Sequence, residues 1–205
     1  MTKIKICGLT REEDVLFAAD RGADFLGFIF VPSTPRFIEP ERAAEITAQV
    51  RAREQRPRLV GVFRDASADY IRNIATVVGL DLVQLHGNES GDDIRAIGIP
   101  AIKTFRVADA LPETNGHSAA DWFLFDTFED RRAGGTGRHF DWSLLKTYRR
   151  TKPFFLAGGL GPDNIGAAIT LVRPDAVDVS SGDESDPGIK DRGTIESLFR
   201  RMRPS

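Results

Sequence analysis

Residues 3–10, KIKICGLT, begin the repeating pattern from which the fold follows, because charged and apolar residues alternate there up to a glycine. Side chains alternate along a β-strand, so Ile4 and Ile6 face one way while Lys5 and Cys7 face the other. The following glycine lets the chain turn, which places Cys7 at the carboxyl end of a predicted strand. Ligands bind at that end in parallel α/β folds, although the position equally suits a small buried apolar side chain.

Short apolar runs like this one alternate with longer amphipathic segments along the chain. The predicted strands are residues 3–7, 25–30, 58–63, 82–85, 101–105, 122–125, 154–156 and 176–179. The predicted helices are residues 11–20, 41–53, 68–78, 92–97, 142–150, 164–172 and 193–202. Strands that alternate with helices predict parallel pairing. The polar stretch 108–120 predicts little helix.

Eight such units at about 25 residues each suit an eight-stranded parallel barrel, which usually has ~250 residues. A doubly wound sheet would leave some of the apolar runs without a place. No linker or composition shift interrupts the alternation in the 205 residues. The sequence therefore predicts an α/β fold, a single-domain (β/α)8 TIM barrel over residues 1–205.

Composition excludes several kinds of partner. A formal net charge of −2 and a pI of about 6.0 argue against nucleic acid and against an anionic membrane surface. The single cysteine excludes an internal disulfide and suits a reducing compartment. Residues 1–14 contain no apolar signal core, and the longest apolar run, 25–31, is far too short to span a bilayer. We expect a cytoplasmic protein that binds neither membrane nor nucleic acid.

The ends of the other predicted strands carry further candidate site residues. Arg36 lies in a loop stiffened by two prolines, and its planar guanidinium suits a carboxylate or phosphate, although it could be an ordinary surface arginine. His86 precedes a glycine and could be an acid, a base, a ligand contact or a structural histidine. Asp126 follows three apolar residues and could be catalytic or cap a turn. The glycine-rich stretch 133–137 could be a lid or a flexible connection.

Glycines and serines follow the last two predicted strands. Gly158 and Gly159 precede a predicted helix, and Ser180, Ser181 and Gly182 follow the final strand. Backbone N–H groups on glycine turns, serine hydroxyls and helix N-termini suit a phosphate dianion. The ends of strands seven and eight are also the usual phosphate site of a barrel.

The chemistry predicted from the residues is proton transfer on a small phosphorylated substrate, with Cys7 and Asp126 as the two proton-handling groups. An isomerase or epimerase is the matching class. The histidines show no metal-ligand spacing and there is no dinucleotide-binding fingerprint, so we expect neither a metal nor a cofactor.

Motifs along the whole chain resemble the phosphoribosylanthranilate isomerase family of tryptophan biosynthesis, whose fold is a (β/α)8 barrel. They are KICGLT (5–10), GADFLGFIF with PSTPRFI (22–38), VGVF (60–63), VQLHGNE (83–89), GGTGRHFDW (134–142), FLAGGLGPDN (155–164) and VDVSSG with GIKD (177–191). The resemblance implies a cofactor-free Amadori rearrangement of N-(5-phosphoribosyl)anthranilate to 1-(2-carboxyphenylamino)-1-deoxyribulose 5-phosphate. It leaves the oligomeric state as monomer or homodimer.

The resemblance also implies roles for most of the candidate residues. Asp126 is the general acid on the ribose ring oxygen, and Cys7 is the general base that removes the C2 proton. Arg36 faces the anthranilate carboxylate, and the glycine and serine turns hold the phosphate. Apart from the resemblance, we expect His86 to contact the substrate. A free thiol has a pKa of about 8.5 and an aspartate about 3.9. The site must therefore lower the pKa of Cys7 or accept a small thiolate fraction, and it must raise the pKa of Asp126.

Two alternatives remain open at this stage. One is another sugar-phosphate barrel isomerase or epimerase, although the related histidine-pathway isomerase has an aspartate where Cys7 stands. The other is a non-catalytic phosphosugar-binding protein, which would not need Cys7 and Asp126 together. The chain departs from the family pattern at Asp183, where an apolar residue is usual; we expect its side chain to face solvent.

Overall fold

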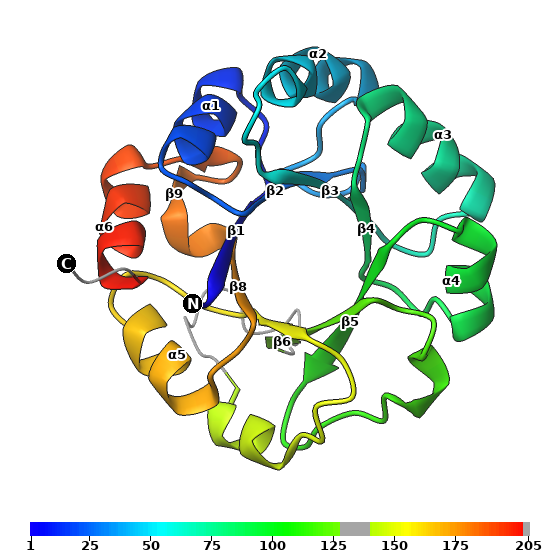
Figure 1. The fold of residues 1–205 in the computed structure, drawn as a ribbon, viewed down its shortest axis with the longest axis vertical. Coiled ribbons are helices and arrows are strands. Elements are labelled where there is room, and N and C mark those ends of the chain that lie inside the picture. Colours follow the sequence, from blue (N-terminus) through cyan, green and yellow to red (C-terminus); the bar gives the residue numbers. More distant parts are fainter. Residues whose placement is uncertain (128–139, 203–205) are drawn as a thin grey trace.

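The computed structural model describes residues 1–127 and 140–202, in which eight parallel strands form a closed barrel (Figure 1). The strands are β1 (Lys3–Cys7), β2 (Phe25–Ile29), β3 (Arg58–Phe63), β4 (Leu82–Leu85), β5 (Ala101–Val107), β6 (Trp122–Thr127), β7 (Phe154–Leu156) and β8 (Ala176–Val179). Each pairs with the next along the chain, and β8 pairs with β1, so that Asp178 lies beside Lys5. The predicted barrel is confirmed.

Helices surround the barrel on the outside (Figure 1). They are α1 (Glu12–Asp20), α2 (Pro40–Arg51), α3 (Ala68–Val78), α4 (Gly91–Ile97), α5 (Ile165–Val172) and α6 (Arg192–Met202). The 3-10 turns are η1 (Asn115–His117), η2 (Trp142–Thr147) and η3 (Ser181–Asp183), and a short antiparallel hairpin is formed by β9 (Glu184–Asp186) and β10 (Ile189–Lys190). The hairpin lies between β8 and α6, and no pattern in the sequence predicted it.

The prediction for residues 142–150 was wrong in type, because the chain forms the shorter η2 instead of an α-helix. The Thr147 hydroxyl donates to the Leu144 carbonyl oxygen, a local bond that competes with helical continuation. Pro153 follows closely and restricts the chain further. As expected, the stretch 108–120 holds little helix, namely the single turn η1.

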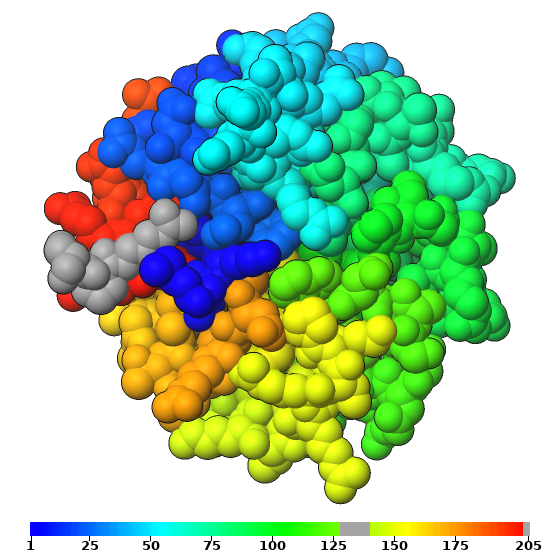
Figure 2. All heavy atoms as spheres, viewed as in Figure 1, coloured from blue at the N-terminus to red at the C-terminus, as the bar shows by residue number. Residues whose placement is uncertain are grey.

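Apolar side chains fill the barrel interior near the amino ends of the strands. Phe25, Val60, Leu82, Ile102, Leu124, Phe155, Ala157 and Ala176 form one buried cluster. The rings of Phe25 and Phe155 are 5.1 Å apart in an edge-to-face arrangement. Side chains close the centre of the ring when all atoms are drawn (Figure 2). This end of the barrel is therefore a packed core.

Polar side chains replace the apolar ones further along the same strands. Gln84, Thr104 and Asp178 each lie two residues beyond a member of the apolar cluster, and so on the same inward face. All three are buried, as is Lys5. The interior therefore becomes polar towards the carboxyl ends, where barrel enzymes bind their ligands.

Candidate active site

A cavity of about 360 Å³ lies at the carboxyl ends of the barrel strands. Its wall contains most of the residues that the sequence predicted as a site: Cys7, His86, Asp126, Gly158, Gly159, Ser180, Ser181 and Gly182. Five strands or the loops that follow them, β1, β4, β6, β7 and β8, supply these residues. Arg36, the other predicted residue, is not part of this wall and is described below.

Cys7 is the last residue of β1 and carries a free thiol that is only 4% exposed. Gly8 follows at φ +77°, so the backbone turns directly after the thiol. Burial raises the pKa of the Cys7 thiol, and the nearby Lys5 ammonium opposes that shift. The site does not depress the pKa of the thiol, so the thiolate is the minor form at neutral pH.

Lys5 and Asp178 form an ion pair that no sequence pattern predicted. The Lys5 Nζ atom lies 2.9 Å from Asp178 Oδ1 and 3.0 Å from Oδ2. The side chain of Lys5 is fully buried, and that of Asp178 is 8% exposed. Asp178 lines the cavity beside Cys7, so the pair lies directly beneath the candidate base.

Asp126 and His86 come from neighbouring parts of the same wall. The Asp126 Oδ1 atom accepts a hydrogen bond from the backbone N–H of Thr127 at 2.8 Å. Its Oδ2 atom lies 3.5 Å from His86 Nε2. Burial, together with the positive charge of Arg106, lowers the pKa of His86 to about 4. The imidazole is therefore neutral at physiological pH, and its Nε2 can share a proton with the carboxyl group without forming an ion pair.

Two glycine turns approach each other at the ends of β7 and β8. Gly158 and Gly159 have φ of +86° and +65°, values that L side chains rarely adopt. A Cβ on Gly158 would lie 2.1 Å from Thr127 Oγ1, and a Cβ on Gly182 would lie 1.9 Å from the Leu160 carbonyl oxygen. Neither distance is possible, so glycine is required at both positions for the loops to pack this closely.

The loop after β7 leads into the N-terminus of α5. The Asn164 side chain accepts from the Gly161 N–H at 2.9 Å and donates to the Gly159 carbonyl oxygen at 2.8 Å. These bonds hold the turn against the first residues of the helix. Together with the serines and Gly182 after β8, they form a cradle of backbone and hydroxyl groups that could hold a phosphate.

Arg36 lies in the loop after β2 and forms a bidentate ion pair with Glu184 of β9, with Nη2 2.6 Å from Oε2. A Cβ on Gly8 would lie 2.8 Å from Arg36 Cδ and 3.2 Å from Ser180 Oγ. Arg36 therefore packs over the turn that follows Cys7, at the edge of the site, with its guanidinium held by Glu184.

Asp183 corrects a prediction, because its side chain is fully buried and does not face solvent. The Lys190 Nζ atom of β10 lies 2.7 Å from Asp183 Oδ1, 2.7 Å from the Ser180 carbonyl oxygen and 3.2 Å from Glu184 Oε1. A buried ammonium needs such acceptors. Asp183 therefore faces inward because the unpredicted hairpin brings Lys190 against it.

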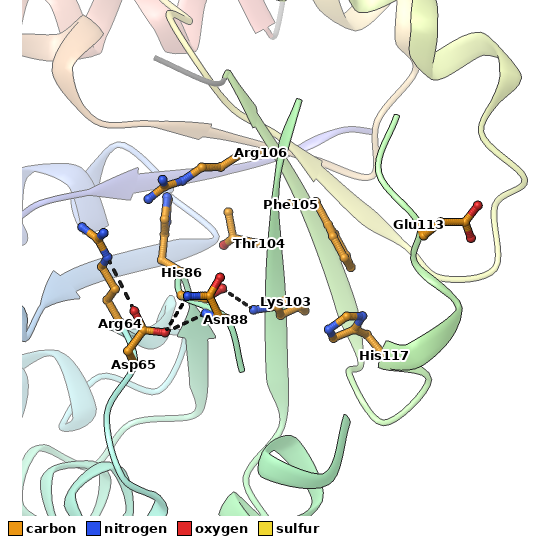
Figure 3. A pocket seen from close by; sticks show the side chains of 11 residues that line it. Arg64, Asp65, His86, Asn88, Lys103, Thr104, Phe105, Arg106, Glu113 and His117 are labelled. Atoms are coloured by element: carbon orange, nitrogen blue, oxygen red, sulfur yellow. Dashed lines mark hydrogen bonds and ion pairs between the residues drawn. The ribbon is translucent and has the colours of Figure 1, made fainter. Parts of the chain in front are cut away.

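A second cavity of about 380 Å³ adjoins the first and shares Arg64, His86 and Arg106 with it (Figure 3). Arg64 and Arg106 approach His86 from the ends of β3 and β5 (Figure 3). Neither arginine was predicted. Arg64 directly follows β3, whose predicted end at residue 63 is correct, and Arg106 lies beyond the predicted end of β5 at residue 105, although the strand continues to Val107. Arg106 lies two residues beyond the inward-facing Thr104. Because side chains alternate along a strand, this spacing could have predicted that Arg106 also faces the interior.

The candidate lid at 133–137 and the first part of the GGTGRHFDW motif, up to His139, lie outside the described residues. Within residues 1–127 and 140–202, no group of three or more histidine, cysteine, aspartate or glutamate side chains is arranged to hold a metal ion. The helices in the same part of the chain are all too short or too polar to cross a membrane.

The closed parallel barrel, with a polar cavity at the carboxyl ends of its strands, defines the chain as a (β/α)8-barrel protein of the enzyme type. The family model for N-(5'-phosphoribosyl)anthranilate isomerase matches residues 4–201. The isomerase of Geotalea uraniireducens (strain Rf4) is 42% identical over 205 residues, which cover 99% of each chain. The chain belongs to the N-(5'-phosphoribosyl)anthranilate isomerase family.

Solved structures agree with this assignment. The phosphoribosyl anthranilate isomerase of Thermotoga maritima superposes with a TM-score of 0.88 at 38% identity, over 98% of both chains. A phosphoribosyl anthranilate isomerase in complex with reduced 1-(o-carboxyphenylamino)-1-deoxyribulose 5-phosphate gives a TM-score of 0.82 at 38% identity, again over 98% of both chains. A further Thermotoga maritima structure, described as monomers generated from a dimeric isomerase, gives 0.84 at 37% identity, with 98% of both chains covered.

Proposed function

We propose that this protein isomerises N-(5'-phosphoribosyl)anthranilate to 1-(2-carboxyphenylamino)-1-deoxyribulose 5-phosphate, a step of tryptophan biosynthesis. The observation that carries the proposal is that Cys7 and Asp126 line one cavity in a chain of this isomerase family. The relative solved with a reduced form of that ribulose phosphate supports a ligand of this size and charge. The oligomeric state, monomer or homodimer, stays a prediction.

The reaction needs two proton transfers. Asp126 gives its proton to the ribose ring oxygen, the C1–O bond breaks, and the sugar opens to an iminium. The Cys7 thiolate then removes the C2 proton, and the electron pair of that C–H bond forms a C1–C2 double bond and neutralises the iminium nitrogen. The resulting enolamine becomes the ketone when the C2 hydroxyl loses its proton and C1 gains one.

In this mechanism Asp126 must hold a proton when the ring opens. The neutral imidazole of His86, 3.5 Å away, adds no positive charge, whereas Arg106 beside it on β5 and the Thr127 N–H both favour the carboxylate. Since the substrate carries a phosphate and a carboxylate, its negative charge on binding is what favours the protonated acid.

The substrate's two anionic groups require separate binding sites. The glycine turns at Gly158 and Gly182 approach closely enough to form a phosphate cradle after β7 and β8. Arg36 lies on the Cys7 side of the site and is the candidate for the anthranilate carboxylate. It keeps Glu184 as its partner through Nε and Nη2, so the carboxylate would bind to the remaining edge of the guanidinium.

The loss of phosphoribosylanthranilate fluorescence on addition of the purified protein tests the proposal, with the substrate generated in situ. We expect rapid loss with the native protein. Cys7→Ala and Asp126→Asn should each slow turnover by at least ~100-fold, the usual contribution of one acid or base group.

Gly166→Ala, on the outer helix α5 with open space around the added methyl group, is the matched control and should keep native rates. Circular dichroism confirms that each variant is folded. No turnover by the folded native protein would refute the proposed reaction, whereas native rates in Cys7→Ala would refute the assigned base.

A further inference from the structure

We propose that Lys5, anchored by Asp178, is a positioning residue that holds an ammonium group against Cys7 and stabilises its thiolate. The catalytic meaning of this inference rests on the proposed function, in which Cys7 is the general base. Its structural basis is independent of that function, because it concerns only how three buried side chains of β1 and β8 are arranged.

Lys5 and Cys7 share one small space inside the barrel. They lie two residues apart on the same face of β1, and Gly27 of β2 is the residue paired with Cys7. A Cβ on Gly27 would lie 2.7 Å from Cys7 Sγ and 3.1 Å from Lys5 Cε. The missing side chain of Gly27 is therefore what lets the lysine stem and the thiol pack together.

Asp178 keeps the ammonium in this space. An ammonium group has three donors and no acceptor. Two of the Lys5 donors go to the Asp178 oxygens, at 2.9 and 3.0 Å. Burial raises the pKa of Cys7, and the positive charge of Lys5 opposes that rise. Without Asp178, a fully buried lysine would tend to lose its proton.

Two other cations near the thiol are held by carboxylates. Arg36 is held by Glu184, and Lys190 is held by both Asp183 and Glu184. Asp126, His86, Arg64 and Arg106 line the same cavity. Among these groups, Lys5 is the cation whose side chain packs with Cys7 in the space left by Gly27. Its charge is therefore the one placed to stabilise a buried thiolate.

The single cysteine makes a direct test possible, because alkylation by iodoacetamide reports on Cys7 alone. The rate is measured against pH for the native protein and for Lys5→Met/Asp178→Asn, which removes both buried charges together. We expect the pH at which the alkylation rate is half-maximal (the midpoint) to rise by about one unit or more in the double variant. Alkylation at pH 7 should then be ~10-fold slower, and kcat should fall while KM changes little.

Lys3→Met is the matched control. Lys3 lies on the same face of β1, two residues before Lys5, and its Nζ atom lies 5.8 Å from the centre of the Phe25 ring, near the amino end of the barrel. This variant removes one positive charge from the same strand and should leave both the midpoint and turnover unchanged. An unchanged or lower midpoint in the folded double variant would overturn the proposal.

Lys5→Gln alone provides a second readout if the double variant does not fold, because its amide can still donate a hydrogen bond to Asp178. It removes the cation that lowers the pKa of Cys7 and keeps the carboxylate, so the midpoint should rise. An unchanged or lower midpoint would overturn the proposal. Alkylation needs no substrate, so a native protein that fails to turn over phosphoribosylanthranilate would refute the proposed function and still leave the role of Lys5 to be decided.

Discussion

Arg36 donates three hydrogen bonds to Glu184, with Nε 2.8 and 3.0 Å from the two carboxylate oxygens and Nη2 2.6 Å from Oε2. Among the described residues, Nη1 has no such partner. The pair therefore fixes the plane of the guanidinium while leaving one edge for another acceptor. Because the Glu184 side chain is only 4% exposed, the orientation of Arg36 is set by the β9–β10 hairpin.

Arg36→Ala should raise KM for phosphoribosylanthranilate by at least ~10-fold with a smaller effect on kcat, because a hydrogen bond to a charged group is lost. The substitution also leaves Glu184 without its main partner. The double variant Arg36→Ala/Glu184→Gln removes that second effect and should show the same rise in KM. An unchanged KM in both variants would mean that the anthranilate carboxylate is bound elsewhere.

Gly182→Ala should weaken phosphate binding, because the new Cβ would lie 1.9 Å from the Leu160 carbonyl oxygen and force the two loops apart. We expect a rise of at least ~10-fold in the inhibition constant for inorganic phosphate and a parallel rise in KM. Gly166→Ala, with open space around it on α5, should leave both unchanged and stabilise the helix by about 0.5–1 kcal/mol. Native phosphate affinity in Gly182→Ala would exclude this cradle.

Local signals account for the parts of the structure that the sequence predicted. Alternation of side chains at period two shows where the strands lie, and this predicted the barrel. Glycines directly after Cys7 and His86 mark strand ends, and this predicted most of the cavity wall. The same signals cannot reveal which strands meet. Lys5 and Asp178 are 173 positions apart and pair only because β8 closes the barrel on β1.

Asp183 shows a second limit of sequence analysis. Its partner Lys190 is only seven positions away, but the two meet because the hairpin at residues 184–190 folds back between β8 and α6. Strands of three and two residues carry too little alternation to be recognised. The sequence therefore predicted that Asp183 faces solvent, whereas in the structure a buried lysine pairs with its carboxylate.

The pKa of Asp183 predicts how stability depends on pH. Burial raises this pKa from 3.8 to about 6, although Lys190 opposes the shift. The native state therefore holds the proton more tightly than the unfolded state, and stability falls as pH rises from about 4 to 6. Above pH 6 the ionised group costs up to about 3 kcal/mol.

Asp183→Asn should therefore unfold at a higher temperature than the native protein at pH 7.5, and the difference should shrink as the pH approaches 4. Thermal unfolding followed by circular dichroism at both pH values measures this. A lower melting temperature for Asp183→Asn at pH 7.5 would show that the ion pair with Lys190 outweighs the cost of burial.

His86 should titrate far below an ordinary histidine. Burial and Arg106 lower its pKa from 6.5 to about 4, so the folded state disfavours the protonated ring. The stability that His86 contributes is complete above pH 6.5 and is lost as pH falls towards 4. An NMR titration, with the signal assigned by comparison with His86→Gln, should give a midpoint near 4. A midpoint near 6.5 would mean that the imidazole is solvated and that its protonated form pairs with Asp126.

Gly27→Ala separates chemistry from binding. Its methyl group would lie 2.7 Å from Cys7 Sγ and 3.1 Å from Lys5 Cε, so both side chains must move, while the phosphate cradle on β7 and β8 is untouched. We expect kcat to fall by ~100-fold, as for loss of the base, with native affinity for inorganic phosphate. Gly182→Ala should do the opposite, changing phosphate affinity far more than kcat. If Gly27→Ala instead kept native kcat in a folded protein, the position of the thiol could not matter to turnover, and Cys7 could not be the base.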